Sequence, residues 1–178
     1  MSPRIVLITG PSAAGKSTVA QAVAERLPRS VHLRGDVFRR MIVNGRATFG
    51  ATLDAEAIRQ FELRYDLAVA AAIRYLEAGF SVVYQDIVVG PALERVVELL
   101  SDWQLTVIVL VPGVEAITLR ERERAKNAYG SAAEVESMLR AFAEDTPRIG
   151  TWIDSTDLTV AETVDAVFRV LEHPVGRT

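Results

Sequence analysis

The sequence predicts an α/β fold in which helices cover both faces of a parallel β-sheet, and two observations carry this prediction. Short apolar segments alternate along the chain with segments whose apolar residues recur at helical spacing. A glycine-rich stretch, residues 10–17, separates the first apolar segment from the first helical one. In parallel sheets of this kind, ligands bind beyond the carboxyl ends of the strands. We therefore expect the functional residues at the end of the sheet where the carboxyl ends of the strands lie.

Each expected element has its own local signal. Asp54 and Gly79 are typical of the first and last positions of a long helix. Residues 131–134 and 159–162 fit the capping-box pattern, which opens a helix. The strands are expected at residues 4–9, 31–33, 80–85, 105–111 and 151–154, with the almost wholly apolar fourth strand in a central position. The helices are expected at residues 16–26, 37–43, 55–78, 91–101, 114–126, 131–144 and 159–172.

Composition limits the classes of function. The chain has 178 residues, of which 49% are hydrophobic, so it can bury a full core as one domain. Its net charge of -3 argues against a nucleic-acid partner, which would require a basic face. The absence of cysteine excludes disulfides and thiolate zinc sites. There is no signal-peptide layout and no apolar run of about 20 residues, so we expect no membrane partner and a cytoplasmic protein.

The glycine-rich stretch fits the phosphate-binding pattern G-x-x-x-x-G-K-[ST] without a mismatch. Gly10 and Gly15 allow the backbone to curl so that successive N–H groups point at one anion, and the helix that follows adds its positive end. Lys16 is expected over the β- and γ-phosphates, while the Ser17 hydroxyl is expected to bind Mg²⁺. The predicted nucleoside triphosphate contacts are Gly10, Pro11, Ser12, Ala13, Ala14, Gly15, Lys16, Ser17 and Thr18.

Acidic residues follow three of the expected strands. Asp36 is predicted to be the catalytic base, which positions an acceptor hydroxyl and takes its proton; the alternative is that it caps the next helix. Asp86 ends an apolar strand, as a Walker-B acid does, and is predicted to hold Mg²⁺; the alternative is a turn residue. Residues 154–156 either line a base pocket or form a turn.

Arginines near Asp36 form the predicted acceptor site. Arg39 and Arg40 follow Asp36 at helical spacing, and Arg46 lies in a polar loop. These side chains could steer an anionic or polyhydroxyl acceptor, or they could be local ion-pair partners of Asp36 or a solvated face.

A second arginine group is expected to form a lid over about residues 120–135. Arg120 and Arg124 are predicted to stabilise charge in the transition state, and Arg122 is predicted to contact the nucleotide. The alternative is an exposed helix with Arg–Glu pairs, each of which contributes little stability.

Two absences favour transfer to a bound hydroxyl over hydrolysis. Asp86 is followed by Ile87 rather than by the glutamate that a motor ATPase would use to activate water. The chain also contains no N-K-x-D motif, which a GTPase would use to read its base.

Several segments together resemble the small P-loop kinases related to nucleoside monophosphate kinases. They are the loop 10–18, the Asp36 segment, the strand end 83–86, the lid arginines and residues 151–156. Among these kinases the chain is most similar to chloramphenicol phosphotransferase-like proteins. The resemblance implies a P-loop NTPase three-layer sandwich over residues 1–178, with a five-stranded sheet in the order 2-3-1-4-5 and a small helical lid. It also implies ATP and Mg²⁺, with Asp36 as the base.

The leading hypothesis is an ATP-dependent phosphotransferase that acts on a hydroxyl of a small antibiotic-like or sugar-like molecule. The alternatives are a nucleotide or nucleotide-sugar kinase, similar to zeta toxins, and a non-catalytic ATP-binding sensor. A polynucleotide kinase is disfavoured by the acidic pI. The sequence leaves the oligomeric state open.

Overall fold

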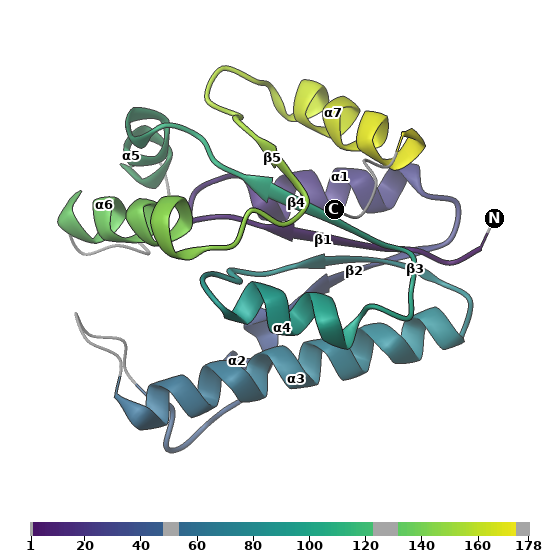
Figure 1. Ribbon diagram of the computed structural model, residues 1–178, viewed down its shortest axis with the longest axis horizontal. Coiled ribbons are helices and arrows are strands. Elements are labelled where there is room, and N and C mark those ends of the chain that lie inside the picture. Colours follow the sequence, from purple (N-terminus) through teal and green to yellow (C-terminus); the bar gives the residue numbers. More distant parts are fainter. Residues whose placement is uncertain (1, 48–53, 123–131, 174–178) are drawn as a thin grey trace.

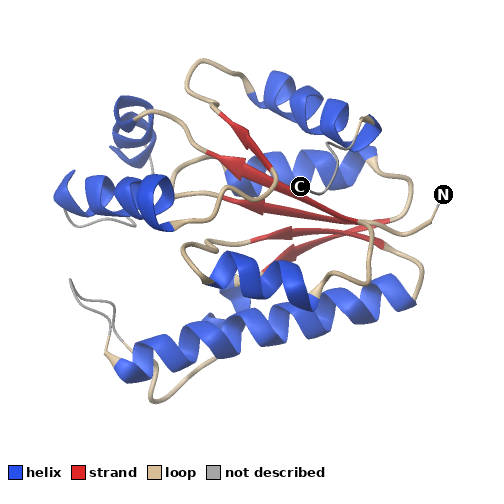
Figure 2. Cartoon of the chain, viewed as in Figure 1, coloured by secondary structure: helices blue, strands red, loops and turns tan. Residues whose placement is uncertain are grey.

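The computed structural model describes residues 2–47, 54–122 and 132–173. Its five strands form one parallel sheet in the order β2-β3-β1-β4-β5, which confirms the predicted fold class and strand order (Figures 1 and 2). The strands are β1 (Ile5–Thr9), β2 (Ser30–Arg34), β3 (Ser81–Gln85), β4 (Leu105–Leu110) and β5 (Thr151–Ile153). β1 occupies the middle of the sheet, and β4 is an interior strand that pairs with β1 and β5.

The helices form a layer on each face of the sheet (Figure 1). They are α1 (Lys16–Arg26), α2 (Asp36–Arg40), α3 (Ala55–Glu77), α4 (Ala92–Leu99), α5 (Val114–Arg122), α6 (Ala132–Arg140) and α7 (Val160–Glu172). α1 and α7 cover one face and α3 and α4 cover the other, while α5 and α6 lie beyond the carboxyl ends of the strands. None of the helices within the described residues combines the length and apolar character that crossing a bilayer requires.

Alternation along the strands divides the core into two apolar clusters. In β3, Val82 and Tyr84 pack on the side of α3 and α4, whereas Val83 packs on the side of α1 and α7. The burial of both faces explains why the strands read as continuous apolar runs rather than as alternating patterns.

Local capping signals account for two of the helix starts. The Asp54 carboxylate accepts a hydrogen bond from the Ala57 N–H at 2.7 Å at the start of α3. Thr159 and Glu162 form the predicted reciprocal capping box of α7. Ser131, the first residue of the other predicted capping box, lies outside the described residues.

Two helical segments differ from the sequence-based expectation. The predicted helix 37–43 is confined to Asp36–Arg40, because the chain turns at Met41. The regular α-helix of segment 132–145 ends at Arg140 and continues as a π-helical turn, Ala141–Asp145. This turn buries Phe142, and Thr146 Oγ1 then donates to the Ala141 carbonyl at 2.8 Å. Propensity does not reveal such a widened turn, because it is set by tertiary packing.

Candidate active site

The loop between β1 and α1 has the curled backbone that its sequence predicts. Gly15 has a φ of +87° and Ala13 a φ of +58°, both in the left-handed region. Gly10 has a φ of +143°, and a Cβ atom there would overlap the carbonyl oxygen of Leu110 at the end of β4. Glycine at position 10 therefore lets the loop lie directly against the neighbouring strand.

Lys16 and Ser17 begin α1 and face the cavity next to this loop. The buried Lys16 ammonium donates to the Pro11 carbonyl at 2.6 Å, which holds the side chain back over the loop. Ser17 Oγ donates to Gln85 Oε1 at 3.0 Å, so the oxygen lone pairs of Ser17 stay available to a cation.

The Ser17 hydroxyl is suited to bind an Mg²⁺ ion that is shared with a nucleotide. No group of three His, Cys, Asp or Glu side chains that could hold a metal occurs within residues 2–47, 54–122 and 132–173. A magnesium ion that is shared with a triphosphate needs only one or two protein ligands, because phosphate oxygens and water complete its shell. The Ser17 hydroxyl, oriented by Gln85, meets that requirement.

A cavity of about 480 Å³ opens beyond the carboxyl ends of β1, β2 and β3. It brings the phosphate-binding loop together with residues from β2, α2, β3 and α3, as expected for a parallel sheet. Its lining residues are Ser12, Ala13, Gly15, Lys16, Ser17, Arg34, Asp36, Arg64, Gln85, Asp86 and Ile87. Both acidic residues that the sequence placed beside the loop therefore share one cavity with Lys16.

The Asp86 carboxylate lies at the bottom of this cavity, with its side chain only 2% exposed. It accepts hydrogen bonds from Arg64 Nη2 at 2.6 Å, from the Ile87 N–H at 2.8 Å and from the Tyr84 hydroxyl at 3.3 Å. Burial raises the pKa of Asp86 to about 6, and this effect outweighs the opposing attraction of Arg64. Gly35 is pressed against the same carboxylate, since a Cβ atom at position 35 would overlap Oδ2.

These contacts bear on the predicted metal role of Asp86. The Ser17 hydroxyl is bonded to Gln85, whereas both oxygens of Asp86 are engaged by Arg64, Ile87 and Tyr84. A direct bond to Mg²⁺ would have to compete with the Arg64 ion pair. The metal role of Asp86 stays a prediction, and a bond through water demands the least rearrangement.

Asp36 is the first residue of α2, and its carboxylate borders the cavity. Oδ2 lies 3.0 Å from Arg40 Nη2, and Oδ1 lies 3.6 Å from Arg34 Nε. The N-cap of α2 is Gly35, and the helix has no side-chain capping bond. The local ion pair predicted as an alternative role for Arg40 is therefore present, and the alternative in which Asp36 caps the helix is absent.

Arg39 joins α2 to the segment that precedes α3. Its Nη2 donates to the Ala47 carbonyl at 2.5 Å. Burial lowers the pKa of Arg39, and the nearby positive charges of Arg46 and Arg64 lower it further. Gln60 of α3 fixes the same segment, because its amide accepts from the Ala47 N–H at 2.9 Å and donates to the Gly45 carbonyl at 2.8 Å.

A second cavity, of about 250 Å³, lies on the other side of the phosphate-binding loop. Thr18 and Arg120 line it, and Arg120 Nη2 donates to the Ser155 carbonyl at 3.1 Å. Ser155 Oγ is buried there without a hydrogen-bond partner. Asp154 instead accepts from Thr156 N–H and Oγ1, in agreement with the turn alternative for this residue.

The predicted lid is only partly covered by the structure. Arg120 is held beside the loop by Ser155. Arg124 and the side chain of Arg122 lie outside the described residues, so their predicted roles stay predictions.

Comparisons with known proteins place this geometry in a family. Residues 5–144 match the profile of a family described as AAA domain. The chain belongs to this family. A search of curated protein sequences gives no significant match.

Solved structures similar to this AAA-domain chain share its fold along almost the whole length. The tunicamycin resistance protein of Deinococcus radiodurans is 18% identical, with a TM-score of 0.67 over 98% of this chain and 97% of that one. A gluconokinase from Sinorhizobium meliloti is 17% identical, with a TM-score of 0.66 over 96% and 93%. The APS kinase of Mycobacterium tuberculosis, solved with AMPPNP and APS, is 18% identical, with a TM-score of 0.70 over 96% and 98%. The fold is that of the small P-loop kinases, as the sequence resemblance implied. The narrower likeness to chloramphenicol phosphotransferases stays a prediction.

Two site residues of this AAA-domain chain were missed by the sequence reasoning. Arg64 interrupts the apolar face of the long helix α3, and a charged residue in such a stripe is a recognisable sign of a buried ion pair. Gln85 stands one residue before Asp86 at the end of an otherwise apolar strand. Strand alternation puts Gln85 on the same side as Val83, which faces α1 and Ser17.

Proposed function

We propose that this chain is an ATP-dependent phosphotransferase that transfers the γ-phosphate of ATP to a hydroxyl group of a small antibiotic-like or sugar-like molecule. The observation that carries the proposal is that Lys16, Ser17 and Asp36 line one cavity. A phosphate-binding loop and an accessible carboxylate within one cavity are the two components that phosphoryl transfer to a hydroxyl requires. Nucleotide-binding kinases of the same fold, such as the APS kinase solved with the ATP analogue AMPPNP, support the choice of nucleotide.

In the proposed reaction, the acceptor oxygen forms a bond to the γ-phosphorus while the bond between this phosphorus and the ADP oxygen breaks. The proton of the acceptor hydroxyl passes to the Asp36 carboxylate. Lys16 and the backbone N–H groups of residues 12–15 stabilise the charge on the phosphates. Mg²⁺, when bound with ATP, would neutralise phosphate charge, and Ser17 would hold it. Arg34 and Arg40 would orient Asp36 toward the acceptor.

We further propose that residues 1–178 form one kinase domain and that ATP binds across both cavities. Its triphosphate would lie at Lys16, and its base would lie in the second cavity, which Arg120 and Ser155 line. The unpartnered Ser155 Oγ supports a polar ligand atom in the second cavity.

A nucleotide or nucleotide-sugar kinase is the second candidate. Arg64 lies over the rings of Phe61 and Tyr65, at 5.0 and 5.2 Å, and these two rings are stacked on each other. Arg64 also lines the cavity, and the plane of a guanidinium group can stack on a planar base.

The proposal is tested by measuring ADP release from Mg²⁺-ATP in the presence of aminoglycosides, chloramphenicol-like drugs, sugars and nucleosides. Wild type and Asp36→Asn are compared, with Asp66→Asn as the matched control, because Asp66 pairs with Arg95 on the surface. We expect one acceptor class to stimulate release, and Asp36→Asn to reduce that stimulation by about 10²- to 10⁴-fold while AMPPNP still binds.

Two results would contradict parts of the proposal. Wild-type rates in Asp36→Asn would show that this carboxylate is not the base. AMPPNP binding without stimulation by any acceptor would favour the non-catalytic sensor.

A further inference from the structure

We propose that the acceptor is an anion, which carries a carboxylate or phosphate group in addition to the hydroxyl that faces Asp36. This inference rests on the proposed function, because it concerns the second substrate of the same site. The group would be bound by arginines of α2, α3 and the segment 44–47.

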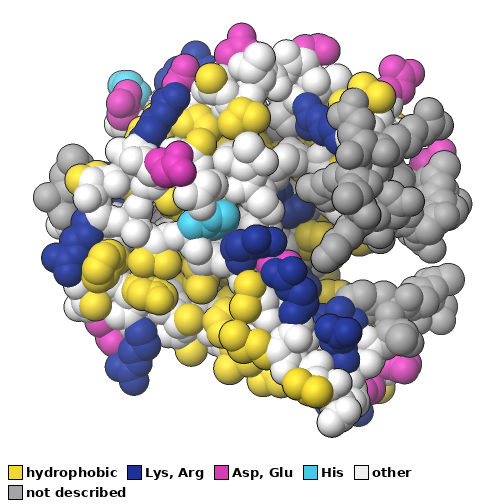
Figure 3. Space-filling model, turned by 180° about the vertical axis from the view of Figure 1, so that it is seen from behind, with side chains coloured by type: hydrophobic (Ala, Val, Ile, Leu, Met, Phe, Trp, Pro, Cys, Tyr) yellow, Lys and Arg dark blue, Asp and Glu magenta, His cyan; other side chains and the backbone are white. Residues whose placement is uncertain are grey.

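The charges around the acceptor side of the cavity are strongly unbalanced. Five guanidinium groups gather there against the two carboxylates of Asp36 and Asp86. The five belong to Arg34, Arg39, Arg40, Arg46 and Arg64. Because the whole chain has a net charge of -3, this positive cluster is a local feature. Figure 3 shows several basic side chains grouped on one face, with an acidic one between them.

The protein frame holds like charges together in this cluster. Arg46 and Arg64 lie close enough to Arg39 to lower its pKa. Arg39 is fixed by its bond to the Ala47 carbonyl, and Gln60 holds the backbone on either side of Arg46. The repulsion between fixed guanidinium groups is relieved when an anion binds among them.

The acids on neighbouring elements already have basic or amide partners. Asp86 is bonded to Arg64, and Asp36 is paired with Arg40. Glu56, at the start of α3, binds Arg59 and the amide of Gln60 along its own helix. Asp36 and Asp86 balance two of the five guanidinium charges, so a net positive charge remains for a bound ligand.

The chemistry of the cluster selects the kind of ligand. The planar fork of an arginine matches the geometry of a carboxylate or phosphate, and a neutral polyol offers it no charge. With the hydroxyl at Asp36 and the anionic group toward segment 44–47, Arg34 and Arg64 line the space between the acceptor anion and the triphosphate. This placement reduces the repulsion between the two bound anions.

The first experiment measures binding to the protein saturated with Mg²⁺ and AMPPNP, so that the phosphate-binding loop is filled and no transfer occurs. Calorimetry compares matched ligands: glucose with glucuronate and glucose 6-phosphate, and adenosine with AMP. We expect the anionic members to bind at least about 10-fold more tightly than their neutral counterparts. Comparison of glucuronate with glucose 6-phosphate shows whether the site prefers a carboxylate or a phosphate group. If no anionic member binds more tightly than its counterpart, the inference is overturned.

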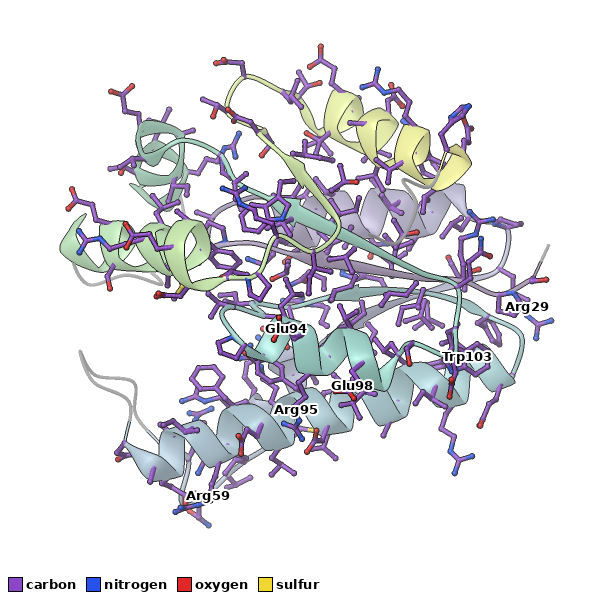
Figure 4. All side chains as sticks on the ribbon, viewed as in Figure 1. Arg29, Arg59, Glu94, Arg95, Glu98 and Trp103 are labelled. Carbon is purple, nitrogen blue, oxygen red and sulfur yellow. The ribbon has the colours of Figure 1, made fainter. Side chains whose placement is uncertain are left out.

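The second experiment uses the variants Arg39→Gln and Arg46→Gln. Arg46 is exposed, so its substitution leaves the core intact. The control is Arg59→Gln, because Arg59 lies on the outer side of α3 with its side chain 65% exposed and paired with Glu56 (Figure 4). We expect each site variant to weaken binding of the anionic ligand, and to raise its KM, by about 10- to 100-fold with little change in kcat. Affinity for the neutral counterpart should not change.

If Arg59→Gln weakens binding of the anionic ligand as much as the site variants do, the effect comes from the general surface charge, and the inference is overturned. ADP release that neutral acceptors stimulate as strongly as anionic ones would overturn it too, yet would leave the proposed kinase function standing. Loss of the proposed function would appear separately, as the absence of acceptor-stimulated ADP release.

Discussion

The nucleotide side and the acceptor side of the cavity are built from different parts of the chain. On the nucleotide side, consecutive residues 10–17 present backbone N–H groups, a lysine and a hydroxyl. On the acceptor side, the groups are side chains from β2, α2, the segment 44–47 and α3. The comparison teaches that phosphate recognition can be encoded locally, whereas acceptor recognition depends on contacts between distant segments.

The largest effect is expected on the nucleotide side. Lys16→Ala removes the charged donor over the phosphates and should lower kcat by roughly 10²- to 10³-fold. ADP release at saturating acceptor measures this, with the exposed Arg74→Ala on α3 as control. If Lys16→Ala keeps an activity within a few-fold of wild type, the phosphate-binding loop does not control phosphate transfer, and the contrast between the two sides of the cavity fails.

The next effect concerns the boundary between the two sides. Arg64→Met leaves Asp86 without its buried partner and should lower the free energy of unfolding by about 3 kcal/mol at neutral pH. Urea denaturation measures the change, and Arg74→Met on the same helix should change stability by less than about 0.5 kcal/mol. At pH 5 the loss should shrink, because Asp86, with a pKa of about 6, is then mostly neutral. An equal loss at pH 5 and pH 8 would contradict this interpretation of the pair.

A smaller effect is expected from Gln85, which positions the Ser17 hydroxyl. Gln85→Ala should raise the Mg²⁺ concentration needed for half-maximal activity, and for AMPPNP binding, by roughly 10-fold. Gln104→Ala, an exposed position before β4, serves as control. If the magnesium requirement of Gln85→Ala is unchanged while that of Asp86→Asn rises, the metal role belongs to Asp86.

A last prediction concerns the pH dependence of stability in the absence of nucleotide and magnesium. The folded state holds a proton on Asp86 up to about pH 6, whereas the unfolded chain releases it near the ordinary value of 3.8. The favourable contribution of Asp86 is therefore present below about pH 4 and lost as the pH rises through 6. Relative to Asp86→Asn, the unfolding free energy of wild type should decline across this interval. A flat difference would show that the pKa of Asp86 is not raised.

Much of the fold could be predicted because its signals are local. α1 begins at Lys16 and ends at Arg26, as its apolar spacing and the following Pro28 indicated. The Asp54 cap and the Thr159 capping box also mark their helices correctly. The strand order came from the family resemblance rather than from residue patterns, because pairing partners are chosen by tertiary packing.

The candidate site was only partly predictable. The phosphate-binding loop follows from the local sequence. The presence of Asp36 and Asp86 in one cavity follows from the rule that ligands bind beyond the carboxyl ends of parallel strands. The partner of the Ser17 hydroxyl depends on strand alternation. Gln85 shares the α1 side with Val83, and Asp86 lies one residue further, on the side of Arg64. A shift of one residue changes the face, so a motif that finds the strand end does not by itself find the residue beside the loop.

The contact between Gly35 and Asp86 limits how this site can be altered. Any side chain at position 35 would displace the carboxylate that holds Arg64. In a directed-evolution library, position 35 should therefore return glycine almost exclusively, even when selection is for folding alone. Arg46, which is exposed, should accept many residues under the same selection. A library that varies Arg46 could therefore yield variants with new acceptor preferences, whereas Gly35 and Asp86 would have to be kept in all of them.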